Sequence, residues 1–257
     1  PPYRGESTNN GEWIMTLMKD YKKEPGGIVK LREQNSKFIN DDYVKFIRYG
    51  QYYIEKNGSG ILAFINPHGY LDNPTFRGMR WSLLKTYDKI FTIDLHGNAK
   101  KNETGLDGTI DQNVFDIMQG VAITIFVKTG KKKTSELGAA FRHDVFGRRE
   151  IKYDFLNSSS LRDVPFVEIQ PQPPMYYLVK KDFELQDKYS NGFSLNDLYG
   201  IYSLGLLTKR DKFITDFEKD TIKKRLSDFI DNKLTNEDLS LKYDLVLKDK
   251  DNWDLAK

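Results

Sequence analysis

Hydrophobic positions in the first 95 residues alternate between two periods. Apolar residues recur at helical spacing in three segments: 11–21, 43–57 and 74–84. Almost continuous apolar runs occupy two shorter segments: 60–65 and 89–95. The helical spacing predicts amphipathic helices, and a short apolar run predicts a strand buried on both faces, as in a parallel sheet. Helices that alternate with such strands are typical of a doubly wound α/β fold.

A polar loop and a second pair of strands follow. Residues 96–112 contain three glycines and no apolar run, and a loop of this length in a compact domain is usually functional or mobile. The apolar segment 121–127 predicts a strand. A basic turn then leads into 139–146, which we expect to be its partner strand. This hairpin would form an antiparallel edge of the sheet.

The sequence changes character near residue 150. Serine-rich and proline-rich stretches punctuate short segments, of which 175–179 is a candidate strand and 217–230 a charged amphipathic helix. We therefore expect two parts: an α/β part at 1–150 and a smaller α+β module at 151–257.

Composition excludes several classes of protein. The chain has 257 residues, of which 39% are hydrophobic, so it can bury a core. It contains no apolar run near 18 residues, so no membrane span is expected. The absence of cysteine excludes disulfides and thiolate chemistry and fits a reducing cytoplasm.

The basic residues carry more information than the formal net charge of +3. Several of them flank predicted loops, where they could contact the phosphate backbone of a nucleic acid. The candidates for DNA contact are Lys100, Lys101, Arg142, Arg148, Arg149, Lys209 and Arg210.

Most catalytic signatures are missing. The histidines His68, His96 and His143 form neither an HxH nor an HExxH pattern, so no metal site is predicted. No glycine-rich phosphate loop of the GxGxxG or GxxxxGK[ST] type occurs. The many carboxylates show no pairing that would separate an acid from a base.

The chain opens on Pro1, Pro2 and Tyr3. Two prolines cannot continue a central strand or a helix, and they suit a rigid turn at a strand end that presents carbonyls and one aromatic face. An unstructured chain end is the alternative interpretation. Because the chain does not begin with Met, we expect residue 1 to follow a cut in a longer protein.

These features together resemble a known family, the DNA methyltransferases that modify adenine at N6, in the γ-class order. Their signature is Asn/Asp-Pro-Pro-Tyr/Phe at a strand end, of which Pro1, Pro2 and Tyr3 are the last three residues. The strand 61–67, the helix with Phe76 and Arg80 and the strand 90–95 are similar to the elements that follow it. Asn113-Val114-Phe115 before 120–128 is similar to a later motif that places an aromatic beside the target base.

More narrowly, several stretches resemble large single-polypeptide restriction–modification enzymes of the type ISP and type IIG-like kind. These stretches are Trp13-Ile14, 41–48, 93–98 and 205–211. The resemblance predicts the C-terminal half of a Rossmann-like methyltransferase sheet in 1–150. It assigns 151–257 to the start of a target-recognition module, with Lys209 and Arg210 as base or phosphate contacts.

The resemblance also implies a site. An amine inside a duplex is unreachable, so the adenine must be extruded and held by stacking. Tyr3 would stack on one face of the base and Phe115 on the other, while the Pro1 carbonyl and the missing Asn/Asp accept the amine hydrogens. No metal is needed for this chemistry.

The implied cofactor is S-adenosylmethionine, whose main binding motifs do not lie in this chain. We therefore expect the isolated chain to be inactive and to need the missing N-terminal part of the polypeptide, with its cofactor-binding and nuclease or helicase segments. The implied partner is double-stranded DNA in the bacterial cytoplasm. A non-catalytic DNA-binding module on an α/β scaffold, and an α/β protein unrelated to nucleic acid, are the alternatives.

Overall fold

The structure is a computed structural model, and it describes most of the chain. The described residues are 9–33, 37–105, 108–185, 188–189, 191–193, 195–199, 210–231 and 234–248. Pro1, Pro2, Tyr3 and Lys209 lie outside this part of the chain. The chain divides into two compact units, 1–183 and 184–257. The boundary expected at residue 150 falls inside the first unit, because a strand beyond it joins the same sheet.

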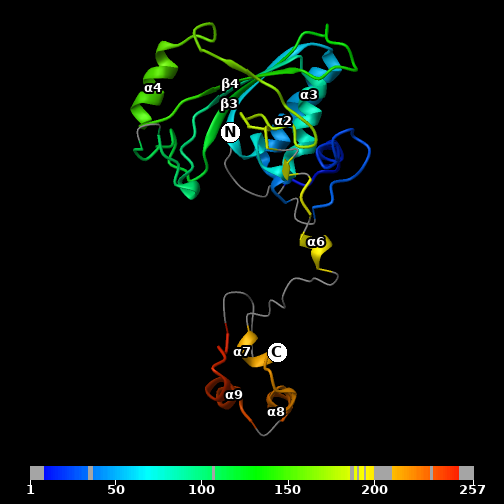
Figure 1. The fold of residues 1–257 in the computed structure, drawn as a ribbon, viewed down its shortest axis with the longest axis vertical. Helices are drawn as coiled ribbons and strands as arrows, with labels where there is room; N and C mark the ends of the chain where they lie inside the picture. The colour runs from blue at the N-terminus through cyan, green and yellow to red at the C-terminus, as the bar shows by residue number, and fades with distance from the viewer. Residues whose placement is uncertain are drawn as a thin grey trace. The chain divides into compact units, whose positions relative to one another are not determined.

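A mixed sheet lies in the first unit (Figure 1). Its five strands follow the order β1-β3-β2-β4-β5. The strands are β1 (Gly60–Pro67), β2 (Lys89–Asp94), β3 (Val121–Lys128), β4 (Ala139–Asp144) and β5 (Val167–Ile169). Strand β3 lies antiparallel between β1 and β2, and β4 is parallel to β2. The strands β1, β2 and β4 therefore run in the same direction, and their carboxyl ends meet at one edge. The predicted α/β class is confirmed.

Two expectations about the strands are wrong. Strands β3 and β4 form no hairpin, because both edges of β3 already pair, with β1 and with β2, and β4 adds to the free side of β2. The antiparallel edge pair is instead β4 with β5. Strand β1 is not buried on both faces. Its only neighbour among the described strands is β3, and the side chain of Ile61 is 68% exposed.

Helices cover both faces of the sheet. The helices α1 (Glu12–Met18), α2 (Asp42–Asn57) and α3 (Arg77–Thr86) share one hydrophobic core with Ala122 and Phe126 of β3. Val121 and Ile123, which flank Ala122 in β3, belong to a second hydrophobic core that includes residues of α4 (Arg149–Ser158). Adjacent strand residues point to opposite faces. Accordingly, α4 lies across the sheet from α2 and α3 (Figure 1).

Short 3₁₀ turns connect these elements. They are η1 (Lys37–Asn40), η2 (His68–Leu71), η3 (Pro74–Phe76) and η4 (Ala99–Lys101). Helix α2 ends at Gly58 as predicted, with a φ of 82° that glycine adopts without steric cost. The backbone at Lys23 packs closely against Gly78 in the first turn of α3. A Cβ on Gly78 would lie 1.9 Å from the Lys23 carbonyl oxygen, so only glycine fits there.

The segment 175–179 is not a strand. Its backbone is held by a side chain, since the guanidinium of Arg80 donates to the Met175 carbonyl at 2.7 and 2.9 Å. Arg80 also donates to the carbonyls of Tyr70 and Asn73, at 2.8 and 2.7 Å. Arg80 is fully buried, and burial lowers its pKa to about 10. Arg80 thus satisfies the Met175 carbonyl, which a strand ladder would otherwise use.

The second unit is helical in its described residues. It contains α6 (Leu195–Leu198), α7 (Asp211–Ile214), α8 (Lys219–Ile230) and α9 (Asn236–Tyr243). The predicted helix at 217–230 is confirmed as α8. Phe213, Leu239 and Leu245 form its small core, and Thr235 and Asp238 form a capping box at α9. In the part of the chain that the structure describes, no helix has the length and apolar content to cross a membrane.

Candidate functional site at the carboxyl edge of the sheet

Polar side chains gather where the three co-directional strands end. His68 follows β1, Asp94 ends β2 with His96 two residues later, and Asp144 ends β4. Ligands of open α/β sheets bind outside the carboxyl ends of strands. A ligand site is therefore expected at this edge.

Asp94 is the centre of the resulting network. Its Oδ1 accepts from His68 Nδ1 at 2.9 Å and from the His96 backbone N–H at 3.0 Å, and its Oδ2 accepts from Arg142 Nη2 at 2.7 Å. His96 Nε2 lies 2.8 Å from Asp144 Oδ1. The network thus links the ends of all three strands.

Burial and charge compete in this network. Burial opposes ionisation of Asp94, but the hydrogen bond from His68 and the nearby charges of His96 and Arg142 hold its pKa well below the ordinary range. Burial also opposes the charge of His96, yet the carboxylates of Asp144, Glu103 and Asp94 raise its pKa to about 9. The strand ends are therefore strongly polar although little exposed.

The backbone around the network is constrained. His96 has a φ of 51°, a left-handed conformation that costs energy for a residue other than glycine. Its ring stacks on Phe146 at 4.0 Å between centroids. Gly120 approaches His68 so closely that a Cβ there would lie 2.4 Å from the imidazole. These contacts fix both rings.

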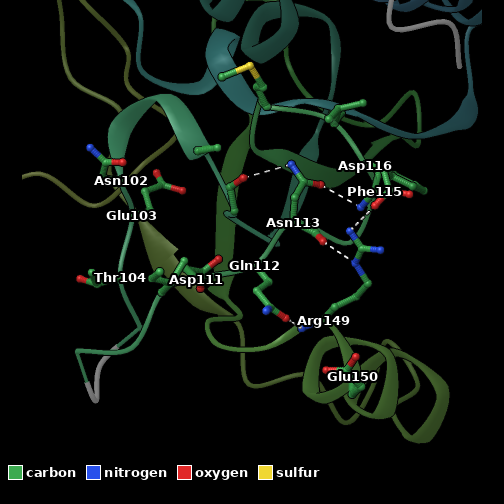
Figure 2. Close-up of a pocket in the computed structure, with 15 residues that line it drawn as sticks. Asn102, Glu103, Thr104, Asp111, Gln112, Asn113, Phe115, Asp116, Arg149 and Glu150 are labelled. Carbon is green, nitrogen blue, oxygen red and sulfur yellow. Dashed lines mark hydrogen bonds and ion pairs between the residues drawn. The ribbon is translucent and has the colours of Figure 1, made fainter.

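A pocket of about 860 Å³ opens beside this edge (Figure 2). Three segments line it: 97–104, 110–118 and the start of α4 at Arg149 and Glu150. Phe115 lies on its wall and is half-buried. The volume of the pocket is within the range of about 300–1,000 Å³ that is typical of small-molecule sites.

Asn113 shapes the turn that carries Phe115. Its side-chain amide donates to the carbonyls of Gly97 at 3.1 Å and Gln119 at 2.6 Å, and its Oδ1 accepts from the Phe115 N–H at 2.9 Å. Asn113 is itself buried. One side chain therefore sets the position of Phe115 relative to both neighbouring loops.

Two side chains of helix α4 also contact the turn that carries Phe115. Arg149 donates to the Asn113 carbonyl at 2.8 Å and pairs with Asp116 at 2.7 Å (Figure 2). Lys152 is fully buried, and its Nζ donates to Asp111 Oδ1, the Leu95 carbonyl and the Gln112 carbonyl. A buried cation with three acceptors ties the loop to the helix.

The structure places the remaining predicted site residues in different parts of the chain. Pro1, Pro2, Tyr3 and Lys209 are outside the described residues, so the predicted sandwich of Tyr3 and Phe115 stays a prediction. Lys100, Lys101 and Arg148 are exposed, and Arg149 is half-buried at the pocket. Arg210 belongs to the second unit, at the N-cap of α7.

The prediction for Arg142 rests on a wrong premise. The residue does not flank a loop; it lies within β4, 7% exposed, and pairs with Asp94 and Asp144. A guanidinium committed to two carboxylates in the interior cannot reach a phosphate backbone. Its role is to compensate the charge of the strand ends.

Sequence reasoning missed the pair of Lys152 and Asp111 and the link from His96 to Asp144. Asp94 lies at the end of the apolar run 89–95, which was an available signal, whereas Asp144 lies inside the strand predicted at 139–146. Lys152 and Asp111 are 41 positions apart, and His96 and Asp144 are 48 positions apart. No local pattern joins the members of either pair.

Comparison with protein-family models finds no match, and comparison with curated proteins finds none either. Solved structures do match. The chain is similar to the DrdV–DNA complex, with a TM-score of 0.62 and 24% identity over 94% of this chain and 25% of the other. It is also similar to the ATP-dependent type ISP restriction–modification enzyme LlaBIII bound to DNA, with a TM-score of 0.61 and 22% identity over 94% of this chain and 16% of that one.

A third match is a nuclease-deletion mutant of the type ISP restriction–modification enzyme LlaGI in complex with a DNA substrate mimic. Its TM-score is 0.60, with 21% identity over 95% of this chain and 24% of that one. At these identities the likeness establishes a shared fold. The chain spans a quarter or less of each of these larger proteins.

Proposed function

We propose that this chain is the part of an adenine-N6 DNA methyltransferase, within a restriction–modification system, that holds an extruded adenine of double-stranded DNA. The observation that carries the proposal is Phe115, held by Asn113 on the wall of the pocket at the carboxyl edge. The base would enter this pocket and stack on the Phe115 ring.

The physics of base extrusion supports this use of the pocket. A target base must be extruded from the duplex before the exocyclic amine of the base can react, and unstacking costs a few kcal/mol. Stacking on an aromatic side chain returns about 1–3 kcal/mol per base. A ring offers that energy only if its own position is fixed in advance, which the contacts of Asn113 and Arg149 do here.

The surroundings of the pocket also support a nucleic-acid partner. Lys100 and Lys101 are exposed on the loop that follows β2, and Arg148 is exposed where α4 begins. Phosphate contacts of this kind supply most of the non-specific affinity for DNA and make it depend on salt. The structures that share the fold are DNA complexes of DrdV, LlaBIII and LlaGI.

S-adenosylmethionine would supply the methyl group. The described residues offer no glycine-rich loop after a first strand, which is the element that holds this cofactor in the resembled family. The described residues of this chain therefore do not by themselves fit the cofactor. Stacking by Tyr3 and acceptance of an amine hydrogen by the Pro1 carbonyl belong to the same proposal.

A duplex that carries 2-aminopurine at the target position tests the proposal, because this base fluoresces when it leaves the stack. We expect binding of the chain to raise the fluorescence. Replacing Phe115→Ala should cost about 1–3 kcal/mol of base stabilisation, which lowers the equilibrium constant for extrusion by roughly 5- to 150-fold. Phe217→Ala, which removes a fully exposed aromatic of the second unit, is the matched control.

Two results would contradict the proposal. Binding without any fluorescence change, at every position of 2-aminopurine tried, would leave a DNA-binding module that does not extrude bases. No salt-dependent binding to duplex DNA would exclude the nucleic-acid partner itself.

A further inference from the structure

We propose that His68, Asp94 and His96 form a binding site for a divalent transition-metal ion such as Zn²⁺. One ligand atom from each of the three side chains lies within 4.8 Å of the other two. Two imidazoles and a carboxylate are a donor set that suits Zn²⁺ and its neighbours rather than Mg²⁺ or Ca²⁺. The inference does not depend on the proposed function.

The spacing of the ligand atoms leaves room for an ion. His96 Nδ1 lies 4.0 Å from Asp94 Oδ1 and 3.9 Å from Glu103 Oε2, both beyond hydrogen-bond distance. His68 Nδ1 approaches Asp94 Oδ1 at 2.9 Å. Tetrahedral ligands about 2.1 Å from a zinc ion stand roughly 3.4 Å apart. The observed separations of 2.9, 3.9 and 4.0 Å fall on either side of that value. A bound ion would therefore replace the hydrogen bond between His68 and Asp94 and draw His96 closer.

Outer partners already orient the ligands. His96 places its Nε2 2.8 Å from Asp144, which turns Nδ1 toward Asp94 and Glu103. Arg142 binds Oδ2 of Asp94, which leaves Oδ1 directed at the histidines. A carboxylate behind a ligating histidine is the usual outer partner in metal sites, where it fixes the tautomer and the ring.

Charge favours a divalent cation at this place. Besides Asp94, the carboxylates of Glu103, Asp72 and Asp144 surround a cavity of about 170 Å³ or contact its lining. Two cationic side chains oppose these four carboxylates, Arg142 and Lys101, the latter 3.8 Å from Asp72. A metal ion binds imidazole in its neutral form. With both histidines as ligands, the four carboxylates and two cationic side chains leave a net charge of −2, which one divalent ion balances.

A bound ion would connect the ends of β1 and β2 to the loop after β2. Glu103, the candidate fourth ligand, also lines the 860 Å³ pocket, together with Gly97 and Asn102 of the same loop. Metal binding would therefore order one wall of that pocket. The site would act as a structural clamp for the loop.

The test titrates Zn²⁺ into the metal-free 257-residue chain by calorimetry, with Co²⁺ absorption spectra reporting the ligand geometry. We expect one ion per chain, a higher Tm with the ion bound, and a visible Co²⁺ spectrum of a nitrogen- and oxygen-ligated centre. His68→Gln and His96→Asn should each weaken binding by at least the roughly 10- to 100-fold that loss of an outer-shell partner costs. Asn is chosen at 96 because it tolerates the left-handed backbone there.

The third histidine provides the control. His143 stacks on Phe155 away from the cluster, and His143→Gln should bind Zn²⁺ like the unaltered chain. Glu103→Gln, a partly exposed position, serves if either histidine variant fails to fold. Absence of stoichiometric Zn²⁺ binding, or binding that survives both histidine variants, would show that the cluster is a hydrogen-bond network without a metal.

Discussion

The buried ion pair between Lys152 and Asp111 allows the sharpest test of how the pocket is built. Both side chains are 0% exposed, and Lys152 Nζ donates to Asp111 and to two backbone carbonyls. Asp111 Oδ2 also accepts from the Gly147 N–H at 2.7 Å. Replacing Lys152→Met keeps the volume of the side chain but leaves a buried carboxylate and two carbonyls without their cation.

The magnitude follows from the burial. Removing one partner of a buried pair costs about 3–5 kcal/mol, because the remaining charge is unpaired in a medium of low dielectric. The first unit, residues 1–183, is large enough that 1 kcal/mol shifts Tm by about 2–4 °C. We therefore expect Lys152→Met to lower the Tm of this unit by roughly 6–20 °C.

Urea unfolding followed by circular dichroism measures the free energy of unfolding. Lys133→Met, at a side chain that is 79% exposed, should change it by less than about 0.5 kcal/mol. The double variant Lys152→Met with Asp111→Asn should recover part of the loss, because no unpaired charge remains. A loss below about 1 kcal/mol in the single variant would refute the claim that this pair holds the loop to α4.

Two further outcomes follow from local geometry. Gly78→Ala should destabilise the first unit by about 1–3 kcal/mol in urea unfolding, because its Cβ would collide with the Lys23 carbonyl. Gly69→Ala, which has open space, should be neutral; equal effects would contradict the argument. The pKa of Glu33 is lowered by its hydrogen bond to Arg77. Its stabilisation is therefore present above the ordinary pKa of 4.5 and lost as pH falls through the lowered pKa, and Glu33→Gln should flatten that part of the stability–pH curve.

Local patterns in the sequence were sufficient for individual elements. The helix at 42–57 has one apolar stripe and ends at Gly58, so its period and its stop signal lie within the segment itself. The strand at 89–94 is an apolar run ended by Asp94, and it is buried between two neighbours as the run predicted. Asn113 and Phe115 likewise form a local motif, and both lie on the pocket wall.

Strand order could not be read in this way. Whether β3 pairs with β4 or inserts between β1 and β2 depends on which edges are free, and backbone hydrogen bonding is the same for every sequence. The insertion of β3 makes β1, β2 and β4 co-directional. Only then do His68, His96 and Asp144 meet, although 28 and 48 positions separate them along the chain.

The sequence by itself determined the helices α1, α2, α3 and α8, most of the strands and the α/β class, because short-range periodicity and turn residues encode them. Helix α4 was not predicted, and Phe115 was singled out by a resemblance to a family motif. The tertiary structure alone decided that Arg142 is an interior counter-ion, that Lys152 is buried, and that two histidines share one carboxylate. The physical reason is that burial and charge pairing depend on contacts between distant segments. No window of neighbouring residues contains those contacts.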